Sequence, residues 1–210
     1  MKHLENLIMR FSKLNACKND IKTAIKKTID CFENNHKLLI CGNGGSAADS
    51  EHIVGELMKG FLKKRPLSNE QKVLMKNKNP NISDDLLSSL QNGFAAISLT
   101  GAPALSTAFA NDVDPFLIYA QQVFVLGNSG DIFIGISTSG NAENVLNAVN
   151  TAKSKGMFTI ALTGGNGGKL KAAADCCIIV PESETFMVQE LHLPVYHAFC
   201  AEIEEHFFTL

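Results

Sequence analysis

The chain has 210 residues, of which 45% are hydrophobic and 19% charged, so it is long enough to bury one globular core. Its formal net charge of −2 gives no long-range attraction to nucleic acid or to an anionic membrane, so any anion must be bound locally. No apolar run approaches the roughly 20 residues that span a bilayer, and the six cysteines show no C-x-x-C spacing. We therefore expect a cytoplasmic protein with reduced thiols and no nucleic-acid or membrane partner.

Helical patterns alternate with short apolar runs along the chain. Two helical stretches, at about 2–15 and 18–35, come first, and a helix at 185–208 comes last. The apolar runs predict strands at 37–41, 94–99, 131–136, 157–162 and 176–180. Because these runs lack strict polar alternation, they predict a parallel sheet covered by helices on both faces. The expected fold is a doubly wound, five-stranded α/β sheet in a single domain over residues 1–210.

Residues 68–92 interrupt this alternation. The segment is polar, Asn79-Pro80-Asn81 breaks it, and residues 84–91 predict a short helix. We interpret it as an insertion at the periphery of the domain or at a subunit contact.

Two hydroxyl-rich turns follow predicted strands. Residues 42–46 form the first turn and residues 137–141 the second. Where such a turn leads from a strand into a helix, the first N–H groups of the helix are unpaired and lie at its positive end. The hydroxyls of Ser46, Ser137 and Ser139 add further donors. In doubly wound folds ligands bind beyond the carboxyl ends of the strands, where both turns lie. The turns therefore predict a phosphate site.

Other interpretations of these turns fit less well. Residues 42–47 match the dinucleotide pattern G-x-G-x-x-G/A, but the next strand ends at Thr100 and not at an acidic residue. The nucleotide-triphosphate string G-x-x-x-x-G-K-[ST] does not occur. Either turn alone is also compatible with a plain helix entry. A third turn, at 163–168, has one hydroxyl and four glycines, and we interpret it as structural.

The helix that begins at the first turn carries Asp49, His52 and Glu56. His52 and Glu56 are four residues apart, so they share one helix face about 6 Å apart along the axis. The pair is suited to one metal or one substrate, although a simple surface contact is the alternative. Polar side chains also occur among apolar neighbours in the last helix, where packing alone explains His192: Gln189, Glu190, His192, Tyr196 and His197.

Together these motifs resemble the sugar isomerase (SIS) family, and more narrowly the bacterial phosphoheptose isomerases. The matching segments are Cys41–Ser46, His52-x-x-x-Glu56, Asn111-Asp112, Gly135–Asn141, and Gln189-Glu190-Leu191-His192 followed by His197. The resemblance implies an aldose–ketose isomerase that converts sedoheptulose 7-phosphate to D-glycero-D-manno-heptose 7-phosphate. It also implies a homotetramer whose sites lie at subunit interfaces.

The resemblance further implies roles for single residues. Glu56 is the expected base and His197 the expected acid of an isomerisation through an enediol, a reaction that needs a strong base and a group to neutralise an oxyanion. Ser46, Ser137, Thr138 and Ser139 are expected to hold the phosphate, with Asn43, Gly44, Asp112 and Gln189 around the sugar. His52, Glu56, Gln189 and His197 match the zinc-binding positions of family members that carry the metal, which implies Zn²⁺ as a cofactor.

The chain departs from the family pattern at three positions. An expected serine is Ala142, an expected arginine is Gly60 beside Lys59, and an expected aspartate is Phe186. In addition, Gln189 and His197 are about 12 Å apart along an unbroken helix. A shared ligand therefore requires long side-chain reaches, a distortion at Pro194 or contributions from two chains, and we favour the last two.

Two alternative functions remain open at this point. One is an isomerase for a different phosphosugar, which the three departures and the insertion allow. The other is a non-catalytic phosphosugar-binding or protein-binding SIS module, similar to a replication-initiation regulator that shares the fold. His197 beside an intact Glu56 favours the enzyme, because that regulator has no histidine at the matching position.

Overall fold

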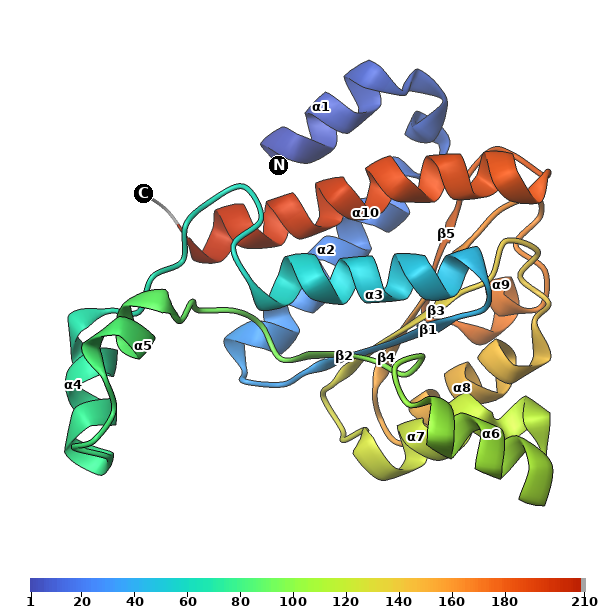
Figure 1. The fold of residues 1–210 in the computed structure, drawn as a ribbon. Coiled ribbons are helices and arrows are strands. Elements are labelled where there is room, and N and C mark those ends of the chain that lie inside the picture. Colours follow the sequence, from blue (N-terminus) through green and yellow to red (C-terminus); the bar gives the residue numbers. More distant parts are fainter. Residues whose placement is uncertain (209–210) are drawn as a thin grey trace.

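A five-stranded parallel sheet forms the centre of the computed structural model, which describes residues 1–208 (Figure 1). In chain order the strands are β1 (Leu38–Gly42), β2 (Ala96–Ser98), β3 (Ile132–Ile136), β4 (Phe158–Thr163) and β5 (Cys176–Ile179). Their order in the sheet is β2-β1-β3-β4-β5, and the register places Ile40 beside Ile134. The predicted doubly wound α/β sheet is therefore confirmed.

Helices cover both faces of this sheet. One layer contains α1 (Lys2–Arg10), α2 (Lys18–Glu33), α3 (Gly45–Met58) and α10 (Thr185–Phe207). The other layer contains α7 (Ile118–Leu126), α8 (Glu143–Ser154) and α9 (Leu170–Ala173), and α6 (Pro103–Asp112) precedes it along the chain. Leu38 and Ile40 pack in the first layer and Leu39 and Cys41 in the second, so β1 is apolar throughout because both of its faces are covered. Within residues 1–208 no helix has the length and apolar character that a membrane crossing needs.

The first predicted helix is shorter than expected. It ends at Arg10, because the backbone of Phe11 (φ −131°, ψ 70°) is not helical, and a 3-10 helix over Ser12–Cys17 leads into α2.

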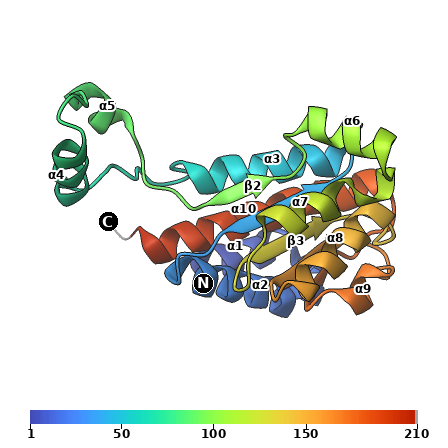
Figure 2. The ribbon, with the colours of Figure 1, turned by 90° about the horizontal axis from the view of Figure 1, so that it is seen from below.

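The insertion forms an arm that stands away from the body of the molecule (Figure 2). It contains α5 (Asp84–Ser89), which matches the predicted short helix, and also α4 (Asn69–Lys78), which was not predicted. Ser68 and Gln71 form a capping box at the start of α4, and this S-x-x-Q pattern was the available signal.

The third glycine-rich turn packs against the second hydroxyl-rich turn. The N–H of Gly164 donates to the carbonyl of Thr138 at 3.0 Å, and the N–H of Leu170 donates to the carbonyl of Gly140 at 3.0 Å. Gly140 has a positive φ of 66°, and a Cβ added there would collide with the Gly167 carbonyl. This packing supports the structural interpretation of residues 163–168.

Candidate active site

The two hydroxyl-rich turns meet at the carboxyl edge of the sheet, because β1 and β3 are neighbours in it. They line one cavity of about 360 Å³. Its wall consists of Asn43, Gly44, Gly45, Ser46, Ile136, Ser137, Thr138, Ser139, Ala142, Thr185 and Gln189. This wall contains no charged side chain, so an anion here relies on hydroxyls, amides, backbone N–H groups and the positive end of α3.

Hydrogen bonds from neighbouring elements hold the first turn in place. Asn43 and Asn144 exchange two amide hydrogen bonds of 2.9 Å each, which link the turn after β1 to the start of α8. The Tyr119 hydroxyl donates to the carbonyl of Gly42 at 2.7 Å. The sequence interpretation missed Asn144, Tyr119 and Thr185, since none of them belongs to a motif.

A second polar group lies further along α3 and α10, which run side by side in the same direction (Figure 1). His52 Nε2 is 3.2 Å from Glu56 Oε1, so the two residues share one helix face as predicted. The other carboxylate oxygen of Glu56 accepts a hydrogen bond from Lys59 Nζ at 3.0 Å. Glu56 is thus held between two nitrogen groups, and only 13% of its side chain is exposed.

Tyr196 orients the imidazole of His52. Its hydroxyl donates to Asp49 Oδ1 at 3.2 Å and lies 3.0 Å from His52 Nδ1. The two ring nitrogens of His52 thus face different partners, Nδ1 the Tyr196 hydroxyl and Nε2 the Glu56 carboxylate. Burial raises the pKa of the Asp49 carboxyl, although Tyr196 and His52 oppose that shift.

His197 completes this group from α10. Its ring centroid is 5.1 Å from that of His52 and 5.6 Å from that of Phe61, and its buried Nε2 has no hydrogen-bond partner. Burial lowers the pKa of His197; the charges of His52 and Arg10 act in the same direction and Glu56 opposes them. The ring is therefore neutral near pH 7, where it can still donate N–H to an oxygen.

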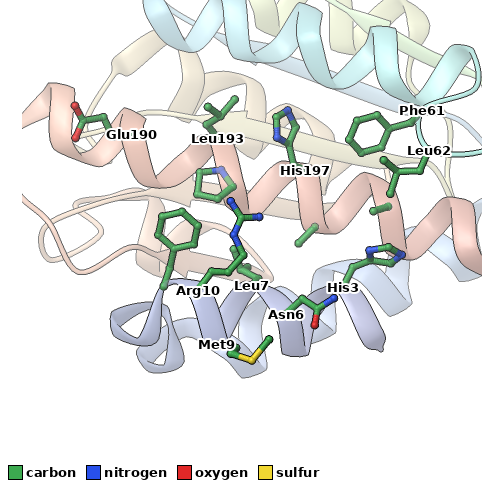
Figure 3. Close-up of a pocket in the computed structure, with 14 residues that line it drawn as sticks. His3, Asn6, Leu7, Met9, Arg10, Phe61, Leu62, Glu190, Leu193 and His197 are labelled. Atoms are coloured by element: carbon green, nitrogen blue, oxygen red, sulfur yellow. The ribbon is translucent and has the colours of Figure 1, made fainter.

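A larger cavity, of about 590 Å³, gives access to His197 from the side of α1. Figure 3 shows His197 and Phe61 on one wall of this cavity, and His3 and Arg10 of α1 on the opposite wall. Leu193 and Glu190 extend the wall along α10. The polar group around His197 thus borders an open space large enough for a small molecule.

The four residues matched to zinc positions are not brought together in one chain. Gln189 lines the cavity between the two hydroxyl-rich turns, beside Gly45, whereas His197 lies next to His52. Helix α10 continues through Pro194, so no break there closes the distance of about 12 Å between Gln189 and His197. Among residues 1–208 there is no group of three His, Cys, Asp or Glu side chains arranged to hold a metal.

Asp112 also lies apart from the cavity. It is exposed at the end of α6, where it accepts a hydrogen bond from Asn111 Nδ2 at 2.9 Å. The departure at Gly60 has a local cause: its N–H donates to Gln91 Oε1 at 2.8 Å, and a Cβ added there would collide with the Lys63 carbonyl. Of the other departures, Ala142 lines the cavity and Phe186 is 58% exposed.

His192 lies in the core, where burial lowers its pKa from 6.5 to about 4. Between pH 6.5 and pH 4 the unfolded chain therefore binds a proton at His192 that the folded chain does not bind. The free energy of unfolding consequently falls as the pH drops from 6.5 towards 4. We expect this residue to account for about 3 kcal/mol of that loss. Urea unfolding of His192→Leu at pH 7 and pH 4.5 should show a correspondingly smaller difference, whereas His206→Gln, an exposed control, should leave the wild-type difference unchanged.

Comparison with known proteins matches residues 2–104 and 94–164 to a family described as the SIS domain. A phosphoheptose isomerase of Helicobacter pylori (strain P12) is 39% identical over 187 residues, which cover 89% of this chain and 84% of that protein. The solved phosphoheptose isomerase of Francisella tularensis superposes with a TM-score of 0.74 at 32% identity, over 97% of this chain and 95% of that one. The structure from Neisseria gonorrhoeae gives a TM-score of 0.70 at 32% identity, over 96% and 98%.

Proposed function

This chain belongs to the phosphoheptose isomerase family of SIS-domain proteins, and we propose that it converts sedoheptulose 7-phosphate to D-glycero-D-manno-heptose 7-phosphate. The observation that carries the proposal is the arrangement of two sites along α3 and α10: a hydroxyl-lined, phosphate-type cavity and a carboxylate–imidazole group. The reaction needs both, a holder for the phosphate and a proton-transfer pair at the carbonyl.

The spacing of the two sites suits a long sugar. Ser46 lies at the cavity, and His52 follows six residues later, about 9 Å along the helix axis. A ligand that fills both sites carries its phosphate far from its reacting carbons. An open-chain heptulose 7-phosphate has this form, because its carbonyl is at C2 and its phosphate at C7.

Glu56 is positioned to move the proton. Its carboxylate removes the proton from C1 of the ketose and returns one to C2, which yields the aldose through an enediol. His197 donates its N–H to the substrate oxygens, where negative charge develops in the enediol-forming step. Lys59 Nζ holds one carboxylate oxygen of Glu56 through the contact at 3.0 Å, and the Tyr196 hydroxyl keeps the His52 ring turned towards the base.

We also propose that this group binds zinc, with His52, Glu56 and His197 as the protein ligands. Two imidazoles, one of them with an unpartnered Nε2 (His197), and a carboxylate suit the ion chemically, although the side chains must reorient to bind it. When bound, zinc would polarise the substrate carbonyl. We expect a homo-oligomer, and a tetramer in particular, in which Gln189 of a second chain reaches the same centre.

Zinc binding can be measured apart from activity. We expect about one zinc per chain in the purified protein by elemental analysis, and at least a tenfold weaker affinity in His52→Ala, because one of three ligands is lost. His206→Ala, a change at an exposed histidine paired with Glu33, serves as the control. Full zinc occupancy after removal of both His52 and His197 would refute these ligands.

Phosphorylated sugars, rather than free sugars, are expected to raise the melting temperature. At 100 times its dissociation constant, a ligand that binds only the folded chain adds about 2.7 kcal/mol, or roughly 5–10 °C for a chain of this size. Differential scanning fluorimetry with sedoheptulose 7-phosphate and free sedoheptulose measures this. The double variant Ser137→Ala/Ser139→Ala should lose most of the shift, and equal shifts for both sugars would contradict a phosphate site at these turns.

A panel of phosphorylated ketoses tests the function itself. Incubation of the purified protein with phosphates of five-, six- and seven-carbon ketoses should give aldose fastest from the seven-carbon sugar. Preference for a shorter sugar would keep the isomerase and change its substrate. Absence of any aldose would reject the isomerase.

A further inference from the structure

We propose that Arg65 and Glu204 act as a positioning pair that fixes the separation of Glu56 and His197. The proposal rests on the proposed function, because it assumes that these two residues perform the proton transfer. Neither Arg65 nor Glu204 belongs to the motifs, and neither lines the phosphate-type cavity. Their side chains are 0% and 1% exposed, and Arg65 Nε donates to Glu204 Oε1 at 2.8 Å.

Arg65 holds the end of the helix that carries the base. Its Nη2 donates to the main-chain carbonyl of Glu56 at 3.2 Å, and its Nη1 donates to the carbonyl of Leu57 at 2.8 Å. These carbonyls belong to the last turn of α3, where helical partners run out. The guanidinium therefore fixes the backbone position of the base itself.

Glu204 holds the loop that follows α3. Its Oε1 accepts from the N–H of Phe61 at 2.9 Å, and its Oε2 accepts from the N–H groups of Leu62 at 2.7 Å and Lys63 at 3.1 Å. The ring of Phe61 in turn contacts His197. Glu204 follows His197 by seven residues, two turns along the same side of α10. One carboxylate thus ties the helix of His197 to the loop that packs on His197.

The surroundings leave this pair little freedom. The Arg65 guanidinium lies 5.2 Å from the Phe94 ring centroid and 4.9 Å from that of Phe208. Its planar fork makes three directed hydrogen bonds at once, which an ammonium group on a flexible stem cannot reproduce. The geometry therefore calls for arginine at this position and not merely for a positive charge.

A second buried carboxylate provides a matched control. Asp131 accepts from the main-chain N–H of Lys37 at 3.0 Å and of Asn128 at 2.8 Å, and its side chain is 2% exposed beside Lys37 Nζ. It lies at the start of β3, the edge of the sheet opposite to the site. Loss of its charge should reduce stability without a specific effect on proton transfer.

The test measures kcat, KM and melting temperature for Arg65→Lys, Glu204→Gln and Asp131→Asn, each at a temperature where it is folded. A third variant of the pair, Arg65→Met/Glu204→Gln, removes both charges and so avoids an unpaired buried charge. For the three variants of the Arg65–Glu204 pair we expect kcat to fall about 10- to 100-fold, because small displacements of the reacting groups slow the chemical step, while KM changes less than about threefold. Asp131→Asn should lose stability and keep kcat.

The double variant separates positioning from stability. We expect its melting temperature to recover relative to Glu204→Gln, while its kcat stays low. A kcat that recovers with the melting temperature would overturn the proposal, as would a loss of kcat in Asp131→Asn of the same size. Failure of all three pair variants to fold would also overturn it, because the pair would then serve the fold. A wild-type protein that isomerises no phosphosugar would instead reject the proposed function.

Discussion

Replacement of Glu56 by glutamine should lower turnover by about 10²- to 10⁴-fold, the usual contribution of a positioned general base. The amide keeps the size of the side chain but cannot take a proton. Because the proposed phosphate site lies at the other end of α3, the melting-temperature shift with sedoheptulose 7-phosphate should stay close to that of the wild type. Nuclear magnetic resonance in D₂O should show no deuterium entering the substrate.

Glu51→Gln is the matched control for this experiment. Glu51 lies on the same helix, is exposed and accepts a hydrogen bond from the Thr100 hydroxyl at 2.9 Å, outside both sites. Its replacement should leave turnover and exchange within about twofold of the wild type, as expected for a surface change. Near-normal turnover in Glu56→Gln would remove Glu56 from the role of base.

Replacement of Gly140 by alanine should destabilise the protein by about 3 kcal/mol or more and abolish the phosphosugar shift. Gly140 has a positive φ, and the new Cβ would collide with the backbone of Gly167 and Gly168. The second hydroxyl-rich turn must therefore move away from the third turn, which displaces Ser137 and Ser139 from the cavity. Urea unfolding and scanning fluorimetry with sedoheptulose 7-phosphate measure the two effects.

Gly165→Ala separates the collision from the backbone strain. Gly165 has a similar positive φ of 58°, but nothing lies within 4 Å of an added Cβ. This variant should cost only about 1–2 kcal/mol, the strain of a left-handed alanine, and keep the phosphosugar shift. Equal losses in the two variants would show that the packing of the turns does not support the site.

Local patterns in the sequence were sufficient to predict the sheet and the hydroxyl-lined cavity at its carboxyl edge. The central strands β1, β3 and β4 are apolar runs because both of their faces are covered, and the two turns meet because β1 and β3 are neighbours. Helix α4 was missed, since its residues are polar and its only signal is the Ser68–Gln71 capping box. Helical rise alone also gave the separation of Gln189 and His197, which the continuous helix α10 retains.

Sequence patterns could not predict contacts between residues that are far apart in the chain. Tyr119 contacts the first turn from 77 residues later in the sequence and Asn144 from 101 residues later, and no spacing rule connects them to it. Arg65 and Glu204 are 139 residues apart and lie in no motif. The family resemblance was confirmed by the comparisons, whereas zinc, the tetramer and the roles of all the site residues, Glu56 and His197 included, stay predictions.

Incubation of the wild-type protein with sedoheptulose 7-phosphate in D₂O, followed by nuclear magnetic resonance, tests most directly whether the carboxylate–imidazole group moves a proton on a sugar held by its phosphate. This mechanism predicts heptose 7-phosphate that carries deuterium at C2, and no reaction of free sedoheptulose under the same conditions. A phosphosugar that raises the melting temperature yet gives neither aldose nor deuterium incorporation would contradict it and indicate a binding protein instead.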